Sequence, residues 1–139
     1  MRLLVVYDST YGHTEKIAQA IGEAIDGRVL RVGDVKPADL VGVDLLIVGS
    51  PTHGGFPSPG IDGLLKALPA LEGLSVAAFD TRTRRTIFGY AAPRIARRLE
   101  KRGGKLVAPP EGFFVAGKNG PLVEGELARA AGWAKGIVS

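Results

Sequence analysis

The sequence predicts a doubly wound α/β protein, in which helices cover both faces of a five-stranded parallel sheet. Short apolar runs alternate with longer stretches whose apolar residues recur at helical spacing, as in a parallel sheet with crossover helices. The loops after the first, third and fourth runs are rich in Gly, Pro, Ser, Thr and His, which suits a ligand site at one edge of the sheet. With 139 residues and 45% apolar content, residues 1–139 have the size of a single domain with one core.

The first predicted elements are a buried strand, a tight loop and an amphipathic helix. Residues 3–7 form an apolar run, and helical spacing follows the loop through Ile17, Ile21 and Ile25. Hydroxyl groups of Ser9, Thr10 and Thr14 surround the helix start, where backbone N–H groups and the helix dipole favour an anion.

That loop contains no Lys or Arg, so a phosphate bound there would be held by neutral donors. The same residues also fit a simpler interpretation, in which Ser and Thr cap the helix and Gly12 supplies the turn.

The middle of the chain predicts two further strands and two helices. Residues 28–32 form a short strand and residues 37–40 a brief helix. Residues 43–49 are apolar on both faces, which is typical of a central parallel strand. A Gly- and Pro-rich loop follows at residues 50–60, and a helix starts at Ile61 with a stripe of Leu64, Leu65 and Leu68.

The C-terminal part completes the sheet. Residues 75–80 form the fourth strand, residues 81–89 a polar loop, and a helix ends at residues 103–104. Two strand pieces, 105–107 and 112–115, are separated by two prolines, and the last helix begins near residue 124. The expected buried positions of these two helices are Ala92, Ile95, Ala96 and Leu99, and then Leu127, Ala131 and Ala134.

Composition excludes several kinds of site. The chain has no Cys, so it has neither a disulfide framework nor a thiolate nucleophile or metal ligand. No paired carboxylates, catalytic triad or metal-ligand cluster stands out in the sequence, and no apolar run reaches the roughly 20 residues of a spanning helix. We therefore expect a cytoplasmic protein without membrane insertion.

The loop Ser9-Thr10-Tyr11-Gly12-His13-Thr14 resembles the phosphate-binding signature of the flavodoxin family. Tyr11 is a departure, because flavodoxins usually have Thr there, and the change removes one hydroxyl near the phosphate. The resemblance extends over nearly the whole chain and is nearest to the short-chain members. It implies bound FMN and the strand order 2-1-3-4-5, which is taken over from flavodoxin, the standard example of this sheet, and is not worked out from the sequence.

The resemblance also implies roles for two later loops. His53 falls where many flavodoxins place an aromatic residue over the flavin. Gly54 falls where a backbone peptide flips to form a hydrogen bond with flavin N5, and only Gly tolerates both orientations of that peptide. In the third loop, Phe88 or Tyr90 would supply the second stacking ring. The predicted FMN-binding residues are Ser9, Thr10, Tyr11, Gly12, His13, Thr14, Pro51, Thr52, His53, Gly54, Gly55, Thr81, Arg82, Phe88 and Tyr90.

Four of the aromatic and imidazole residues have simpler structural interpretations. His13 could shape the phosphate loop without titrating, and His53 could be an ordinary hydrogen-bonding loop residue. Phe88 and Tyr90 could be core residues at the start of the fourth helix.

Charge is the main departure from the usually acidic flavodoxins. The net charge is +4, and half of the 18 basic residues lie in residues 82–105. We expect four of them, Arg97, Arg98, Lys101 and Arg102, to form a solvated helix face. Arg82, Arg84 and Arg85 fall in the loop predicted to border the flavin, where one positive charge roughly 8 Å away would favour the reduced anion by about 2 kcal/mol.

The leading prediction is therefore an FMN electron carrier that passes electrons between redox partner proteins. Its positive charge predicts a flavin of higher potential, or partners with acidic docking surfaces, or both. One alternative is an enzyme, an NAD(P)H-dependent FMN quinone or flavin reductase, with Arg82, Arg84 or Arg85 holding the nucleotide phosphate. The other is a flavin-free domain that binds an anionic partner through its basic face. Nucleic acid is not favoured as that partner, because the sequence has no helix-turn-helix pattern and no basic surface interleaved with aromatic residues.

Overall fold

The computed structural model describes residues 1–84 and 87–139 and confirms the predicted parallel sheet. The strand order is β2-β1-β3-β4-β5, with β6 also paired to β4, and every pairing is parallel. The strands are β1 (Leu3–Tyr7), β2 (Arg28–Arg31), β3 (Leu45–Pro51), β4 (Ser75–Arg82), β5 (Lys105–Leu106) and β6 (Glu111–Phe114).

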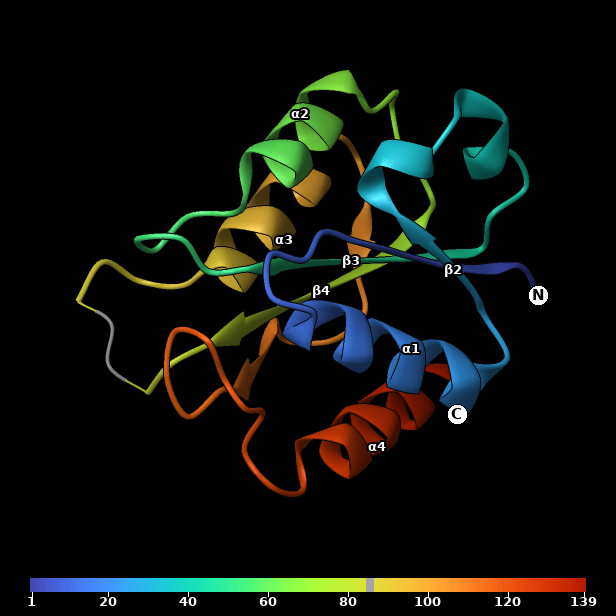
Figure 1. Cartoon of the computed structure of the whole chain (residues 1–139). Helices are drawn as coiled ribbons and strands as arrows, with labels where there is room; N and C mark the ends of the chain where they lie inside the picture. Colours follow the sequence, from blue (N-terminus) through green and yellow to red (C-terminus); the bar gives the residue numbers. More distant parts are fainter. Residues whose placement is uncertain (85–86) are drawn as a thin grey trace.

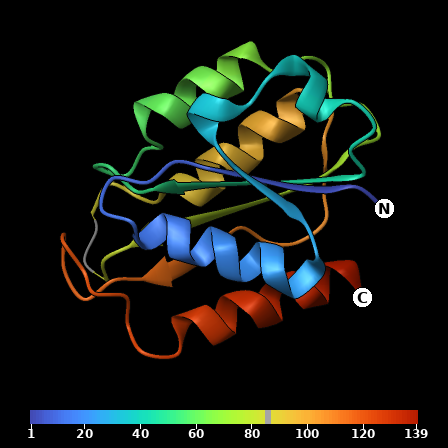
Figure 2. The ribbon, with the colours of Figure 1, turned by 45° about the vertical axis from the view of Figure 1, so that its right-hand side comes forward.

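The helices form one layer on each side of the sheet (Figures 1 and 2). Helices α2 and α3 cover one face, and α1 and α4 pack side by side on the other. The helices are α1 (His13–Ile25), α2 (Pro59–Ala67), α3 (Ala91–Lys101) and α4 (Glu126–Val138), with 3₁₀ turns η1 (Val32–Asp34) and η2 (Pro37–Leu40) after β2.

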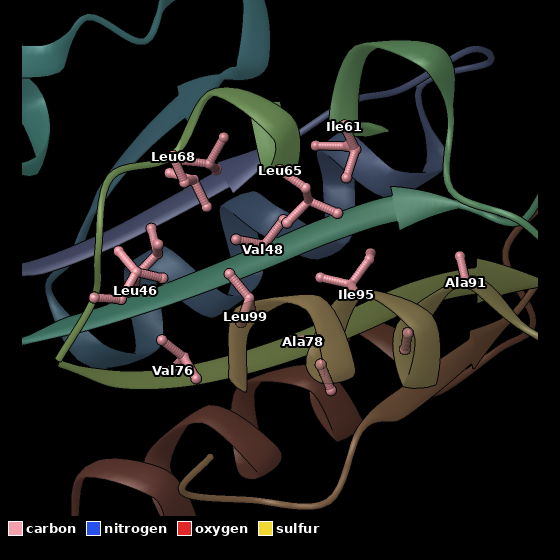
Figure 3. Close-up of a cluster of buried hydrophobic side chains, with 14 of the residues drawn as sticks. Leu46, Val48, Ile61, Leu65, Leu68, Val76, Ala78, Ala91, Ile95 and Leu99 are labelled. Carbon is pink, nitrogen blue, oxygen red and sulfur yellow. The ribbon is translucent and has the colours of Figure 1, made fainter. Parts of the chain in front are cut away.

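Alternate residues of each central strand enter different cores because side chains in a strand point to opposite faces. Leu46 and Val48 of β3 face α2 and α3, where they meet Ile61, Leu65 and Ile95. Figure 3 shows this cluster, in which side chains of β3, β4, α2 and α3 point toward one another.

The opposite core lies between the sheet and the pair α1 and α4. Ile47 of β3 enters it together with Ile17 and Ile21 of α1. Phe79 and Phe113 meet Trp133 edge-on there, with ring centroids 6.3 and 6.0 Å from the Trp133 ring.

The fifth strand is divided into two pieces, as the sequence predicts. β5 pairs with the start of β4 at Ser75 and Val76, and β6 pairs with its end from Phe79 to Arg82. Residues 109 and 110 between the pieces are prolines, which lack the N–H group that a continuous ladder needs.

Two helix starts and one helix face differ from the prediction. Helix α2 begins at Pro59 and not at Ile61, because the Ser58 side chain accepts a hydrogen bond from the Ile61 N–H and caps the helix. Helix α4 begins at Glu126 after Gly125, whose φ of 89° stops the helix from starting earlier.

The buried face of α4 is consequently shifted in register. It carries Ala130 and Ala134, whereas Leu127, predicted to be buried, is 45% exposed, and Ala131 is only partly buried. No helix in the described part of the chain is long and apolar enough to cross a membrane.

Candidate functional site

The carboxyl ends of β1, β3 and β4 surround a cavity of about 1100 Å³. The strand register explains why they meet, since Tyr7 pairs with Gly49 and Pro51 pairs with Thr81, so that all three strands end at the same edge. The cavity is lined by Thr10, Tyr11, His13, Thr14, Pro51, Thr52, His53, Gly54, Gly55, Thr81, Arg82, Thr83, Arg84, Ile87, Phe88, Val115 and Lys118.

At one end of the cavity lies the N-terminus of α1. Gly12 caps this helix with φ 90°, and no side chain accepts a hydrogen bond at the cap. The Ser9 hydroxyl oxygen instead accepts a bond from the Gly12 N–H at 2.9 Å and so holds the turn. Because the first N–H groups of a helix have no intrahelical acceptor, this end is a preformed set of anion donors next to the hydroxyls of Thr10 and Thr14.

Asp8 fixes the start of this loop to the neighbouring helix. One of its carboxylate oxygens accepts a bond from the Ser9 N–H at 2.9 Å, and the other accepts from the Ser58 hydroxyl at 2.6 Å. Because Ser58 caps α2, the loops after β1 and β3 are joined at their bases.

A turn after β6 completes this end of the cavity. Lys118 lines the cavity, and Gly120 in the same turn lies so close to the imidazole of His13 that a Cβ there would be 2.2 Å from His13 Cε1. Both ring nitrogens of His13 are buried and have no hydrogen-bond partner among the described residues. His13 therefore forms the contact between the α1 loop and the β6–α4 turn.

The second loop forms a tight turn at residues 53–56. The backbones of His53 and Phe56 exchange two hydrogen bonds of 2.8 and 3.0 Å, and Gly54 and Gly55 between them have φ of 56° and 88°. A Cβ on Gly55 would lie 2.2 Å from the Phe88 carbonyl oxygen, so only Gly allows the second and third loops to approach this closely.

A buried carboxylate, Asp80, holds the third loop. It is fully buried and accepts two bonds from Arg82 at 2.7 and 2.8 Å and one from the Ala92 N–H at 2.8 Å. The Thr52 hydroxyl bonds it as well. Burial raises the pKa of Asp80, and the bonds from Arg82 oppose that rise.

The Arg82 guanidinium is consequently not free to act on a ligand as an unpaired charge. It is paired with Asp80, its Cζ lies 3.5 Å from the centre of the Tyr90 ring, and a Cβ on Gly112 would be 2.1 Å from it. Arg84 also lines the cavity and has its Cζ 4.6 Å from the centre of the Phe114 ring. Arg85 lies outside the described residues.

Most of the predicted FMN-binding residues come together. All of them line the cavity except Ser9, Gly12 and Tyr90, of which the first two build the α1 turn and the third packs against Arg82. His53 faces the first loop, with Nε2 3.3 Å from the Thr10 hydroxyl oxygen. Phe88 is 63% exposed at the cavity, so the alternative that it is a core residue is wrong.

Sequence reasoning missed Thr83, Ile87, Val115 and Lys118 as lining residues. Val115 and Lys118 follow β6, which ends at the same edge as β4, since Phe114 pairs with Arg82. The rule that loops after parallel strands meet at one edge would have found these two, had it been applied to the fifth strand as well.

The family model described as Flavodoxin matches residues 5–133, and no curated protein matches the chain. Oxidised flavodoxin 1 from Bacillus cereus superimposes with a TM-score of 0.83 at 19% identity, over 99% of this chain and 97% of that one.

Two further structures illustrate the range of similar proteins. A flavodoxin from the domain Archaea gives a TM-score of 0.83 at 24% identity, over 99% of this chain and 96% of the other. Rubredoxin oxygen:oxidoreductase from Desulfovibrio gigas gives 0.80 at 22% identity, where 98% of this chain matches 35% of that larger one.

Proposed function

Because this chain belongs to the flavodoxin family, whose members bind flavin mononucleotide, we propose that its cavity binds FMN and that the protein carries electrons between redox partners. One observation supports this proposal most directly. A cavity of about 1100 Å³ lies where three separate loops meet, and at one end of it is the N-terminus of α1, where no side chain accepts a capping hydrogen bond.

The residues present fit the two chemical halves of FMN. The N–H groups at the start of α1 and the hydroxyls of Thr10 and Thr14 would hold the phosphate, and Lys118 adds a positive charge that the loop itself lacks. His53 and Phe88 would flank the flavin ring system. When bound, FMN supplies one- and two-electron chemistry, while the protein positions it and sets its electrostatic surroundings.

At the proposed ring end, Gly55 lets the second loop approach the Phe88 backbone of the third loop closely. Because Gly55 has no side chain, no bulky group separates the second and third loops, which would enclose the flavin ring. This fit is steric and does not depend on the charge of the chain.

Positive charge near the cavity supports a raised flavin potential and partners with acidic docking surfaces. Arg84 is the charge to test first, because the guanidinium of Arg82 is already paired with Asp80. Redox titration of Arg84→Ala against Arg82→Ala separates the two, and an unchanged potential in the Arg84 variant would remove the electrostatic part of the proposal.

FMN titration of the apoprotein tests the main proposal. We expect FMN fluorescence to be quenched and the visible flavin bands to shift, with 1:1 stoichiometry. Gly55→Ala should weaken binding about tenfold or more, because the added methyl meets the Phe88 carbonyl and the φ of 88° is strained. Gly132→Ala on α4, where the new Cβ meets nothing within 4 Å, is the matched control.

Two results would contradict the proposal. Absence of any spectral change with excess FMN would show that the cavity does not bind this cofactor. Rapid steady-state NAD(P)H oxidation by the FMN-loaded protein would replace the carrier with a reductase.

A further inference from the structure

A second hollow lies beside the proposed flavin cavity, between the N-terminal half of α2 and the residues of α3 from Arg94 to its end at Lys101. This groove has a volume of about 560 Å³. It is lined by Phe56, Pro57, Pro59, Asp62, Arg94, Arg97, Arg98 and Lys101, and is here named the α2–α3 groove. Its apolar part comes from the end of the second loop and its basic part from α3.

The residues that line the groove include four basic side chains and one carboxylate. Its one carboxylate, Asp62, is already paired with Arg98 at 2.5 Å and with Lys66 at 3.1 Å. Arg97 and Lys101 are exposed, stand four residues apart on one face of α3, and pair with no carboxylate in the described part of the chain.

Arg94 connects this groove to the flavin loops. Its Nε donates to the Gly55 carbonyl oxygen at 2.9 Å, one of its terminal nitrogens donates to the Phe88 carbonyl oxygen at 3.2 Å, and its guanidinium lies 4.0 Å from the centre of the Phe56 ring. Gly55 and Phe88 line the flavin cavity, whereas Phe56 and Arg94 line the groove. The two hollows are therefore separated by the thickness of one loop.

The rim of the flavin cavity, in the second and third loops, carries exposed apolar side chains. Phe56, Ile87 and Phe88 are 54%, 88% and 63% exposed. Small electron-transfer complexes bury less than about 1,200 Å² in total, or up to about 600 Å² on each partner. Because Gly55 lines the flavin cavity and the next residue, Phe56, lines the groove, a partner that covers the cavity and this rim also reaches the groove, where Arg97 and Lys101 would lose water and need anionic partners.

We propose that the α2–α3 groove is the docking site for a carboxylate-bearing segment of the redox partner, placed beside the exposed apolar rim of the flavin cavity. This inference rests on the proposed electron-carrier function and assigns a place to its acidic partner. It also revises the expectation that Arg97, Arg98 and Lys101 form only a solvated face. All three line the groove, and the carboxylate there, Asp62, is already paired with Arg98.

Binding of fluorescein-labelled hexaglutamate, followed by anisotropy at low ionic strength, tests the proposal. The test variant is Arg97→Glu with Lys101→Glu. Its matched control is Lys16→Glu with Lys135→Glu, which makes the same change in net charge at exposed positions of α1 and α4 on the other face of the sheet. The milder pair Arg97→Gln with Lys101→Gln serves if the reversed pair folds poorly.

We expect the groove variant to weaken hexaglutamate binding about fivefold or more and the control to weaken it less than about twofold. Equal losses in both would mean that the peptide responds only to net charge and would overturn the proposal, as would no binding to the wild-type protein. Tighter binding of labelled hexathymidylate than of hexaglutamate would assign the groove to another class of anion. Because the peptide assay uses apoprotein, its outcome is separate from that of the FMN titration.

Discussion

Replacing Arg82 by Met tests whether the Asp80–Arg82 pair holds the third loop. The substitution keeps the aliphatic stem but removes both hydrogen bonds to Asp80, which is fully buried and has its pKa raised by that burial. Removing one partner of a buried pair leaves an uncompensated charge, which costs about 3–5 kcal/mol. We expect a loss of that size at pH 7, measured by urea unfolding.

The pH dependence gives the sign of the effect. A carboxyl whose folded-state pKa is raised contributes stability that is present below its unfolded pKa, about 3.9 for Asp, and is lost as the pH rises through the folded value. Because loss of Arg82 raises the pKa of Asp80 further, the stability difference between wild type and variant should grow as the pH rises and shrink toward pH 4.

Two controls make this interpretation sharper. Arg97→Met, on the exposed face of α3, should change stability by less than about 0.5 kcal/mol. Adding Asp80→Asn to the Arg82 variant should recover part of the loss, because the unpaired charge is then removed. A loss below about 1 kcal/mol that does not vary with pH would refute the reasoning, since the pair would then contribute no more than a surface ion pair.

Three further substitutions probe the core, the α4 contact and the loops. Gly49→Ala should destabilise the protein by about 1–3 kcal/mol, because its Cβ would lie 2.0 Å from the Phe79 ring, whereas Gly63→Ala on α2 has open space and serves as the control in urea unfolding. Glu126→Gln should lower stability at pH 7 by about 1–3 kcal/mol. Hydrogen bonds from Arg129, and then from the Phe114 N–H, hold the pKa of Glu126 below its usual range. The stability that Glu126 contributes is therefore present above its unfolded pKa and is lost as the pH falls through its folded pKa. Thermal unfolding from pH 7 to 3 should show the stability difference between wild type and variant shrinking. Arg94→Met should speed FMN release about fivefold or more in stopped-flow displacement, because it removes the hydrogen bonds from Arg94 to the Gly55 and Phe88 carbonyl oxygens. An unchanged release rate would show that the two loops hold their positions without Arg94.

Much of the fold was readable from the sequence because the signals are local. The two-face apolar character of residues 45–48 predicted a central strand, and the helical spacing of Ile17 and Ile21 predicted α1. The loop after β1 could be predicted as a candidate anion site from its hydroxyls, although the same residues also fitted a simple helix cap and turn. The strand order came from the family resemblance, and the structure confirms it.

Local signals failed where a contact with a distant segment decides the outcome. The stripe on α4 was predicted at Leu127, Ala131 and Ala134, and of these only Ala134 is fully buried. The helix begins after Gly125, where Glu126 accepts a bond from the Phe114 N–H of β6, and Ala130 faces inward. Tyr90, which the resemblance offered with Phe88 as the second stacking ring, packs against Arg82 and does not line the cavity. The residue type limits which interactions a side chain can form, and the segments packed around it determine which of those interactions form.

By itself, the sequence determined the alternation of strands and helices, the edge at which the loops gather and the excess of positive charge. Only the tertiary structure decided which of those positive charges are paired with a carboxylate. It pairs Arg82 with Asp80 and Arg98 with Asp62, and it leaves Arg97 and Lys101 without a carboxylate partner among the described residues. The physical reason is that secondary structure follows from near neighbours in the chain, whereas a charge is neutralised by whatever group the fold brings within a few ångströms.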